Sequence, residues 1–460
     1  MKRIAAAVPR RSGKGAPSGG VKGVRLPDFQ EFDTSGGLRT IFAERGPLPL
    51  ITLLLSLPVG SALDPKRKEG LADFTASLLR RGTRKRSADE INEAVEFCGA
   101  SLSCGADEDF LSMRITVPSE HLKPMLEIMA ELVRWPSFPN KEVDSARERL
   151  LAQIANDLDD PGHIADRALL RALWGDHPYG HDIVGRSRDV RTFTRKDAVG
   201  FHRARFGPRV GLLVIAGQAD ARQVRALTER CFGSWRGGPE AAPAIPPLGH
   251  PPMAGKILIV DKPDQTQSQV RIGGSGFAKG SPDVFAASAM NTVLGGSFTS
   301  RLMQAIRVNR GLSYGVNSGF DRLMAGGWFS VSTFTKTETT REIIDVTLSE
   351  LKKMGNAGPT RAELEAAKTY LGGLYPLKFE TNDAVAGAIA DIRLYHLGDD
   401  WVERYRERLM AVTVEQAREV ARKYLLAEPP TLVLVGKAAL VRKQLAGLGP
   451  QKVIKVAEVR

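Results

Sequence analysis

One pattern, a capped helix followed by a buried strand, occurs twice in this chain and constrains its fold more than any other feature. The first copy reads TRKDA at 194–198 and LLVIAG at 212–217, and the second reads TVEQA at 413–417 and TLVLVG at 431–436. The offset is 219 at the start of the helix motif (413 against 194) and again at the end of the strand (436 against 217). A constant offset over both elements indicates two homologous halves produced by duplication.

Length and punctuation divide the chain further. Its 460 residues exceed what one hydrophobic core usually holds. Strand-like and helix-like patterns do not alternate regularly, which predicts an α+β fold in each half. The stretch GGPEAAPAIPPLGHPPM at 237–253 has no periodic apolar face and is the predicted linker. We therefore expect domains at 26–236 and 254–445, a basic tail at 1–25 and a C-terminal tail at 446–460.

The distribution of charge argues against a nucleic-acid-binding body. The net charge is +13, but positions 1–25 hold seven Lys and Arg residues and no acid, so the other 435 residues carry only +6. The basic tail is rich in Gly, Ser and Pro, which predicts disorder. Its apolar run at 4–8 is too short for a signal peptide, and no run reaches the ~20 apolar residues of a membrane span. We expect a cytoplasmic protein, or a periplasmic one if the start codon is misassigned.

A candidate binding pair lies in the second half, in SFTSRLMQAIRVNRGLSYG at 297–315. The pattern predicts a short helix with Gly311 as its C-cap, followed by an extended segment. Arg307 at the helix end and Tyr314 beyond it would offer a permanent cation and a phenolic hydroxyl. Together they could hold a peptide carbonyl or a developing oxyanion. Taken alone, this spacing is also typical of a solvated arginine and a tyrosine at the edge of the core.

Other candidate sites are weaker. The three cysteines (Cys98, Cys104 and Cys231) form neither a disulfide framework nor a zinc pattern, and we interpret them as buried thiols. His177 and His181 are separated by Pro-Tyr-Gly, which places them on a turn rather than on one helix face. The acids at 157, 159 and 160 are typical of a helix terminus. The chain contains no P-loop and no G-x-S-x-G motif.

Two stretches of the chain, at 70–83 and at 294–316, resemble motifs of the insulinase/pitrilysin metallopeptidases. The family's first domain carries a helix of the form G-L-A-H-x-x-E-H-x-L-x-x-G-T, and GLADFTASLLRRGT at 70–83 keeps both flanks of that frame. LGGSFTSRLMQAIRVNRGLSYGV at 294–316 is similar to the family's second-domain motif, in which the Arg and Tyr seven apart are characteristic. DDP at 159–161 and HPYG at 177–180 also agree. The resemblance covers nearly the whole chain beyond the basic tail and implies two homologous processing-peptidase-like domains, each with a mixed, mostly antiparallel sheet.

The zinc motif itself is replaced. In H-x-x-E-H the two His bind zinc and the Glu activates water. The corresponding residues here are Asp73, Ala76 and Ser77, and the third ligand, a Glu on a later helix, falls at about Gln153. One carboxylate with hydroxyl and amide neighbours cannot hold Zn²⁺ tightly. The resemblance therefore implies no metal and no cofactor in this chain.

The half-length members of this family resemble the mitochondrial processing peptidase, in which one subunit carries the zinc helix and the other lacks it. The resemblance implies that this chain is the zinc-less subunit of a heterodimeric zinc metalloendopeptidase, with zinc in a homologous HxxEH-containing partner. Arg307 and Tyr314 would bind the substrate carbonyl and stabilise the oxyanion at the partner's site. The substrates would be unfolded peptides, added as a strand to an exposed sheet edge.

Two alternatives stay open at this point. The first is a non-proteolytic scaffold, similar to family relatives that serve as core subunits of a respiratory complex. The second is an ordinary enzyme that uses a site without a recognised motif. The intact Arg307 and Tyr314 pair favours the zinc-less subunit over the scaffold.

Overall fold

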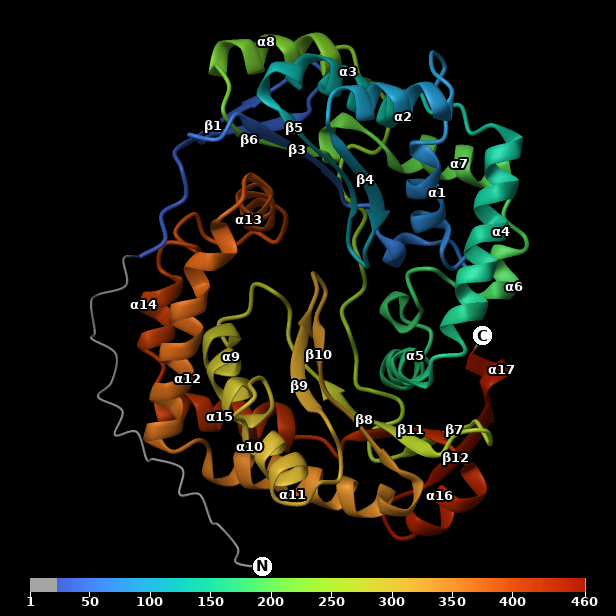
Figure 1. Cartoon of the computed structure of the whole chain (residues 1–460), viewed down its shortest axis with the longest axis vertical. Coiled ribbons are helices and arrows are strands. Elements are labelled where there is room, and N and C mark those ends of the chain that lie inside the picture. Colours follow the sequence, from blue (N-terminus) through green and yellow to red (C-terminus); the bar gives the residue numbers. More distant parts are fainter. Residues whose placement is uncertain (1–22, 460) are drawn as a thin grey trace, which may run out of the picture.

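The computed structural model describes residues 23–459, in which the strands form two six-stranded sheets (Figure 1). The first sheet has the order β1-β2-β6-β3-β5-β4 and the second has the order β12-β7-β11-β8-β10-β9. The strands of the first are β1 (Phe29–Asp33), β2 (Arg39–Glu44), β3 (Leu50–Leu57), β4 (Ser101–Ala106), β5 (Leu111–Pro118) and β6 (Leu212–Gly217). Those of the second are β7 (Ile257–Asp261), β8 (Gln267–Ser275), β9 (Val316–Arg322), β10 (Gly327–Lys336), β11 (Thr431–Gly436) and β12 (Gln451–Lys455).

The two copies of the sequence repeat occupy the same place in the two sheets. β6 pairs parallel with β2 and antiparallel with β3, and β11 pairs parallel with β7 and antiparallel with β8. The helix before each strand starts with a capping box, at Thr194 and at Thr413. The prediction of two homologous α+β halves is therefore confirmed, and most strand pairs in each sheet are antiparallel.

Helices cover the outer face of each sheet (Figure 1). The helices of the first half, whichever face they cover, are α1 (Leu71–Leu79), α2 (Ala88–Phe97), α3 (Leu122–Arg134), α4 (Asn140–Asp157), α5 (Pro161–Trp174), α6 (Ser187–Val190), α7 (Arg195–Arg205) and α8 (Ala221–Phe232). Those of the second are α9 (Val284–Leu294), α10 (Arg301–Met303), α11 (Thr340–Ala357), α12 (Arg361–Leu374), α13 (Asn382–Leu394), α14 (Tyr405–Met410), α15 (Val414–Leu425), α16 (Ala438–Gln444) and α17 (Val456–Val459). None of these helices has both the length and the apolar composition needed to cross a membrane.

The structure differs from the prediction at the C-terminal tail and agrees with it at the linker. The expected C-terminal tail at 446–460 is instead part of the fold, because β12 lies in it and extends the second sheet beside β7. Short apolar and basic runs such as QKVIK gain a partner only through tertiary pairing, so their pattern alone did not indicate a strand. The predicted linker at 237–253 contains neither helix nor strand. Of the basic tail, residues 1–22 lie outside the described residues.

Each half contributes one helix to the inner face of the other half's sheet. α13 packs on β3 and β6, where Val385 and Ile389 contact a cluster that includes Leu54 and Val214. α5 packs on β8 and β11 of the second sheet, where its Leu169 belongs to the same buried cluster as residues of β7 and β11. Figure 1 shows both helices between the two sheets. The exchange explains why every residue of β6 and β11 is buried, since both faces of each strand are covered.

A buried carboxylate joins the two halves where the β4–β5 hairpin meets the β9–β10 hairpin. Asp109, which is 2% exposed, accepts hydrogen bonds from the Tyr179 hydroxyl of its own half. It also accepts from the amide of Met324 (2.8 Å) and from the Tyr395 hydroxyl (3.3 Å), both in the second half. The Tyr179 hydroxyl in turn accepts from the amide of Ala325 (3.3 Å). These bonds fix the relative position of the two halves.

The neighbouring Glu108 should make the stability of the protein depend on pH. Burial, together with the charges of Asp107 and Asp109, raises the pKa of Glu108 from 4.5 to about 7. A carboxyl whose pKa is higher in the folded state does not lower the free energy of unfolding at a pH where it is protonated in both states. The destabilisation grows as the pH rises from 4.5 to 7. We expect Glu108→Gln to stabilise the protein by about 1 kcal/mol at pH 8, after solvent screening, and not at pH 4.5. Thermal unfolding of both proteins at the two pH values measures this, and equal shifts at both values would contradict it.

Candidate functional site

Arg307 and Tyr314 are presented at the surface by a short helical segment whose other side is buried. α10 continues directly into a π-helical turn, Gln304–Val308, a form that recurs at functional sites. Leu302 and Ile306 are fully buried and anchor the segment. Gly311 then adopts a φ of +62°, as predicted for the cap, and its amide donates to the carbonyl of Arg307 (3.1 Å).

The guanidinium of Arg307 lies between two exposed aromatic rings. Its Cζ is 5.0 Å from the ring centroid of Phe298 and 5.1 Å from that of Tyr314, distances typical of cation–π contacts. Tyr314 is 80% exposed and Phe298 is 67% exposed. Within residues 23–459, neither the Arg307 guanidinium nor the Tyr314 hydroxyl forms a hydrogen bond or ion pair. The structure thus brings the two predicted side chains together with their donors free to bind a ligand.

The helix at the zinc-motif position, α1, is intact. Its N-cap, Gly70, has a φ of +95° and lies so close to the backbone of Val184 that a Cβ would clash. The carboxylate of Asp64 accepts from the amides of Gly70 (2.6 Å) and Ala72 (2.8 Å), which satisfies the helix start. Burial raises the pKa of Asp64 well above its usual value. The frame that the sequence shares with the zinc helix therefore still serves as structure.

The residues at the four replaced positions already have other contacts or point elsewhere. Asp73 Oδ1 accepts from the amide of Ala106 on β4 (3.2 Å), and burial raises the pKa of Asp73. Ser77 Oγ donates to the carbonyl of Phe74 (2.7 Å). Ala76 is fully buried and Gln153 is exposed on α4. This donor set does not fit zinc, and in the part of the chain that the structure describes no three His, Cys, Asp or Glu side chains gather to hold a metal.

Restoring the glutamate of the motif should damage the fold. Ala76 belongs to the main core cluster of the first half, so Ala76→Glu would overpack it and bury an unpaired carboxyl. We expect a loss of about 1–3 kcal/mol in the free energy of unfolding, measured by urea denaturation. Ser77→His, on the half-buried side of the same helix, is the matched control and should cost less. An Ala76→Glu protein as stable as the wild type would contradict the expectation.

Side chains of α1 and its C-cap bond to the outer edge of β4, the strand beside the helix, and sequence reasoning missed this. The amide of Asp107 donates to the carbonyl of Phe110 across the hairpin. Because successive amides of a strand point to opposite sides, the amide of Ala106 points away from β5, where a peptide could otherwise bind it. Asp73 takes that amide, and Arg80 Nη1 donates to the outward carbonyl of Leu102 (3.3 Å). The edge of β4 is therefore bonded near both ends. A further strand pairing with β4 would have to displace the bonds to Ala106 and Leu102.

The edge strand of the second sheet is treated in a similar way. Asn291 Nδ2 on α9 donates to the carbonyl of Ser318 on β9 (2.9 Å), and the Ser318 amide donates to the carbonyl of Gly295 (3.2 Å). The two sequence-distant contacts carry no motif, so no pattern could have indicated them. Within residues 23–459, the outward-facing backbone groups of Phe320 and Arg322 on β9 form no hydrogen bond, so this part of the edge could pair with another strand.

The remaining candidates have structural roles. His177 Nδ1 accepts from the amide of Tyr179 (3.0 Å), and its Nε2 lies 2.9 Å from the carbonyl of Pro246 in the linker, as expected for a turn. Asp160 caps α5 through the amide of Gly162 (2.7 Å). The three cysteines are free and two of them are buried. Burial raises the pKa of the Cys104 thiol to about 12, which removes it as a nucleophile near neutral pH.

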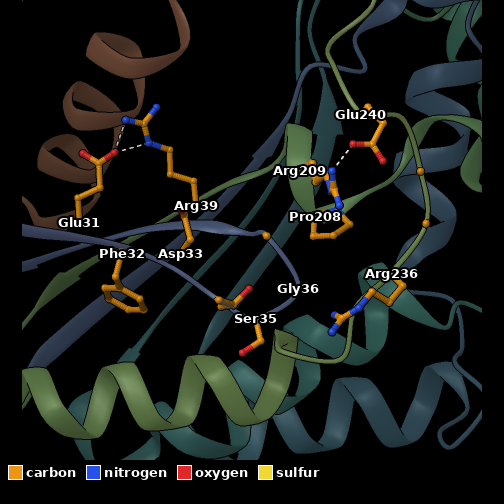
Figure 2. Close-up of a pocket in the computed structure, with 14 residues that line it drawn as sticks. Glu31, Phe32, Asp33, Ser35, Gly36, Arg39, Pro208, Arg209, Arg236 and Glu240 are labelled. Atoms are coloured by element: carbon orange, nitrogen blue, oxygen red, sulfur yellow. Dashed lines mark hydrogen bonds and ion pairs between the residues drawn. The ribbon is translucent and has the colours of Figure 1, made fainter.

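A polar recess of about 680 Å³ beside the turn between β1 and β2 carries three arginines (Figure 2). Arg39 forms an ion pair with Glu31, and Arg209 forms one with Glu240. Arg236 donates to the carbonyl of Gly233 (2.6 Å). Because each arginine has a partner, we assign no ligand to this recess.

Matches to family models span both halves of the chain. Residues 41–187 match the model described as insulinase (peptidase family M16), and residues 192–371 match the one described as peptidase M16 inactive domain. An uncharacterized zinc protease of Mycobacterium leprae is 28% identical over 413 residues, 90% of this chain and 91% of the relative. Another, from Mycobacterium bovis, is 29% identical over 394 residues, 85% of this chain and 89% of the relative.

Solved structures share the arrangement of both halves. The crystal structure of a peptidase M16 inactive domain from Pseudomonas fluorescens has a TM-score of 0.83 and 26% identity, and the match covers 89% of this chain and 98% of that one. The structure of a protease from Helicobacter pylori has a TM-score of 0.81 at 22% identity, covering 90% and 100%. The second likeness is one of fold.

Proposed function

The chain belongs to the insulinase family of peptidases (family M16) without its HxxEH motif, and from this premise we propose that it is the zinc-free subunit of a heterodimeric zinc metalloendopeptidase. Its partner would be a homologous chain with an intact HxxEH helix, and its substrates would be unfolded peptides. The relatives in Mycobacterium leprae and Mycobacterium bovis are named zinc proteases, which supports the peptidase class.

One observation carries the proposal. Asp73 and Ser77, at two of the metal positions, are committed to structural hydrogen bonds. Tyr314 is exposed and Arg307 is half-buried, and neither uses its donors within residues 23–459. A chain that had lost all peptidase function would not need a cation and a hydroxyl held side by side at its surface. Their side chains make no hydrogen bond in residues 23–459, so stability of the fold does not account for them.

In this proposal, Arg307 and Tyr314 act on a peptide carbonyl. The guanidinium offers a fork of N–H donors, and the Tyr314 hydroxyl offers one more from a ring held 5.1 Å from the Arg307 Cζ. Donors placed in advance around a carbonyl oxygen stabilise the negative charge that develops on it. The bonds that occupy the amide of Ala106 and the carbonyl of Leu102 on β4 support a role in which the extended peptide pairs with the partner's sheet.

The experiment combines the purified chain with a homologous HxxEH-containing chain from the same organism. The isolated chain should contain no stoichiometric zinc by metal analysis and should not cleave a fluorogenic peptide library. The mixture should form a 1:1 complex by light scattering, with peptidase activity above that of the paralogue alone. Zinc-dependent activity of the isolated chain would refute the proposal, and a stable complex without peptidase activity would instead identify a scaffold.

A further inference from the structure

A second recess, of about 370 Å³, lies against α13 on the side that faces away from the first sheet. The residues of α13 that line it follow one face of the helix: Ala384, Gly387, Ala388 and Asp391. A Cβ built on Gly387 meets nothing within 4 Å, so the recess reaches the helix backbone there. The opposite face of α13 packs on the first sheet. The recess is therefore a cavity within the second half, separate from Arg307 and Tyr314, which do not line it.

Aromatic rings form one wall of this recess. The rings of Tyr375 and Tyr405 are stacked, with centroids 3.7 Å apart and planes 6° from parallel. Trp401 and Phe379 also line the cavity, and Trp401 and Tyr405 are only partly buried. A planar or apolar group of modest size could pack on this wall with large contact area. A volume near the lower end of the range for small-molecule pockets, about 300–1,000 Å³, limits the occupant to about one or two amino-acid residues in size.

The charges around the recess are predominantly positive. Lys279, Arg322 and Lys378 line it, against the single acid Asp391. Lys279 is engaged, because its Nζ forms an ion pair with Asp391 at 2.9 Å. Arg322 is half-buried and forms no hydrogen bond or ion pair in the described part of the chain; Asp321 and the Tyr405 phenol act on it only electrostatically. Burial lowers the pKa of Arg322, and the nearby Tyr405 and Asp321 offset only part of this effect.

A half-buried guanidinium without a partner beside an aromatic wall is suited to one kind of ligand. The planar fork of Arg matches a carboxylate, with which it forms two parallel charge-assisted hydrogen bonds. The adjacent rings of Tyr405 and Trp401 suit an apolar body. Lys378, exposed at the rim, would add attraction for an anion.

We propose that this recess binds a carboxylate carried on an apolar or aromatic group, with Arg322 holding the carboxylate and Tyr405 and Trp401 contacting the apolar part. Two sources share this chemistry: the C-terminal residue of a peptide, and a small aromatic carboxylic acid. The inference does not depend on a partner subunit, on zinc or on Arg307, so it stands or fails separately from the proposed function.

Calorimetry on the full chain tests the proposal with three probes: N-acetylphenylalanine, a pentapeptide ending in a free phenylalanine carboxylate, and the same pentapeptide amidated at its C-terminus. The two free acids should bind, and the amide should bind at least about tenfold more weakly, as expected when a charge-assisted hydrogen bond is lost. Tighter binding of the peptide than of N-acetylphenylalanine identifies a peptide C-terminus as the ligand, and the reverse order identifies a small acid. Equal binding of the acid and the amide would overturn the proposal. So would the absence of binding by either acid at a probe concentration of about 10 mM, ten times a Kd of about 1 mM.

Two variants probe the recess from opposite walls. Arg322→Met removes the guanidinium and should weaken the free acids to the level of the amide. Gly387→Leu fills the open space on α13 and should abolish binding, while raising helix propensity, so that loss of fold is not expected. Arg225→Met, which alters an exposed arginine stacked on Phe32 in the first half, is the control and should leave binding unchanged. Wild-type affinity in both Arg322→Met and Gly387→Leu would place the ligand elsewhere.

Discussion

Replacing Arg307 with alanine is expected to lower the kcat/KM of the paired complex by about 10²–10³-fold, the loss typical when one oxyanion donor is removed. The reason is that its guanidinium has no other hydrogen-bond partner in residues 23–459, so its donors serve only the ligand. The effect should fall mainly on kcat, because the developing oxyanion carries more charge than the ground-state carbonyl. Initial rates over a range of peptide concentrations measure both constants.

The same complex separates a role in catalysis from a role in folding. Arg307→Ala should change the free energy of unfolding by no more than about 1 kcal/mol, since it removes only two exposed cation–π contacts. Tyr314→Phe keeps the ring beside Arg307 and removes only the hydroxyl, so its loss of activity reports that single donor. Arg225→Ala, which also removes an arginine stacked on an aromatic ring, should leave activity intact. Full activity of Arg307→Ala would exclude the assigned role.

The duplication and the frame of the zinc helix could be predicted because their signals are local. Thr194 and Thr413 start capped helices wherever the chain goes afterwards, and the apolar strands that follow need burial on both faces. The exchange of α5 and α13 between the halves could not be predicted. An apolar helix face has the same pattern whether it packs on its own sheet or on another, and the choice is made by tertiary contacts.

The candidate site shows the same division. The proximity of Arg307 and Tyr314 follows from a short helix, a glycine cap and seven residues, all within one segment. The new role of Asp73 does not, because its partner, the amide of Ala106, lies 33 positions away and any residue can supply an amide. The recess at Arg322 is assembled from segments between Lys279 and Tyr405, so only the folded chain reveals it.

Removing the carboxylate of Asp109 is expected to be the most destabilising single change considered, at about 3–5 kcal/mol for Asp109→Ala. The side chain is 2% exposed and accepts three hydrogen bonds, from Tyr179, Met324 and Tyr395. Its loss leaves two phenol hydroxyls and one amide without their acceptor, and each buried unsatisfied group costs about 1–3 kcal/mol. Asp109→Asn should cost less, because its amide oxygen can still accept hydrogen bonds. Its NH₂ group would face a hydroxyl, which can accept a hydrogen bond as well as donate one.

The distribution of these bonds over both halves gives the prediction a sharper form. Because Asp109 belongs to the first half and Met324 and Tyr395 belong to the second, its removal should also loosen the junction, seen as faster amide hydrogen exchange in both hairpins. Tyr395→Phe should cost stability in the wild type and much less in the Asp109→Ala background, since the hydroxyl has then already lost its acceptor. Asp264→Ala, which removes an exposed carboxylate paired with Lys262, should change stability by less than about 0.5 kcal/mol. Additive costs for Asp109→Ala and Tyr395→Phe would show that the bond between them does not hold the halves together.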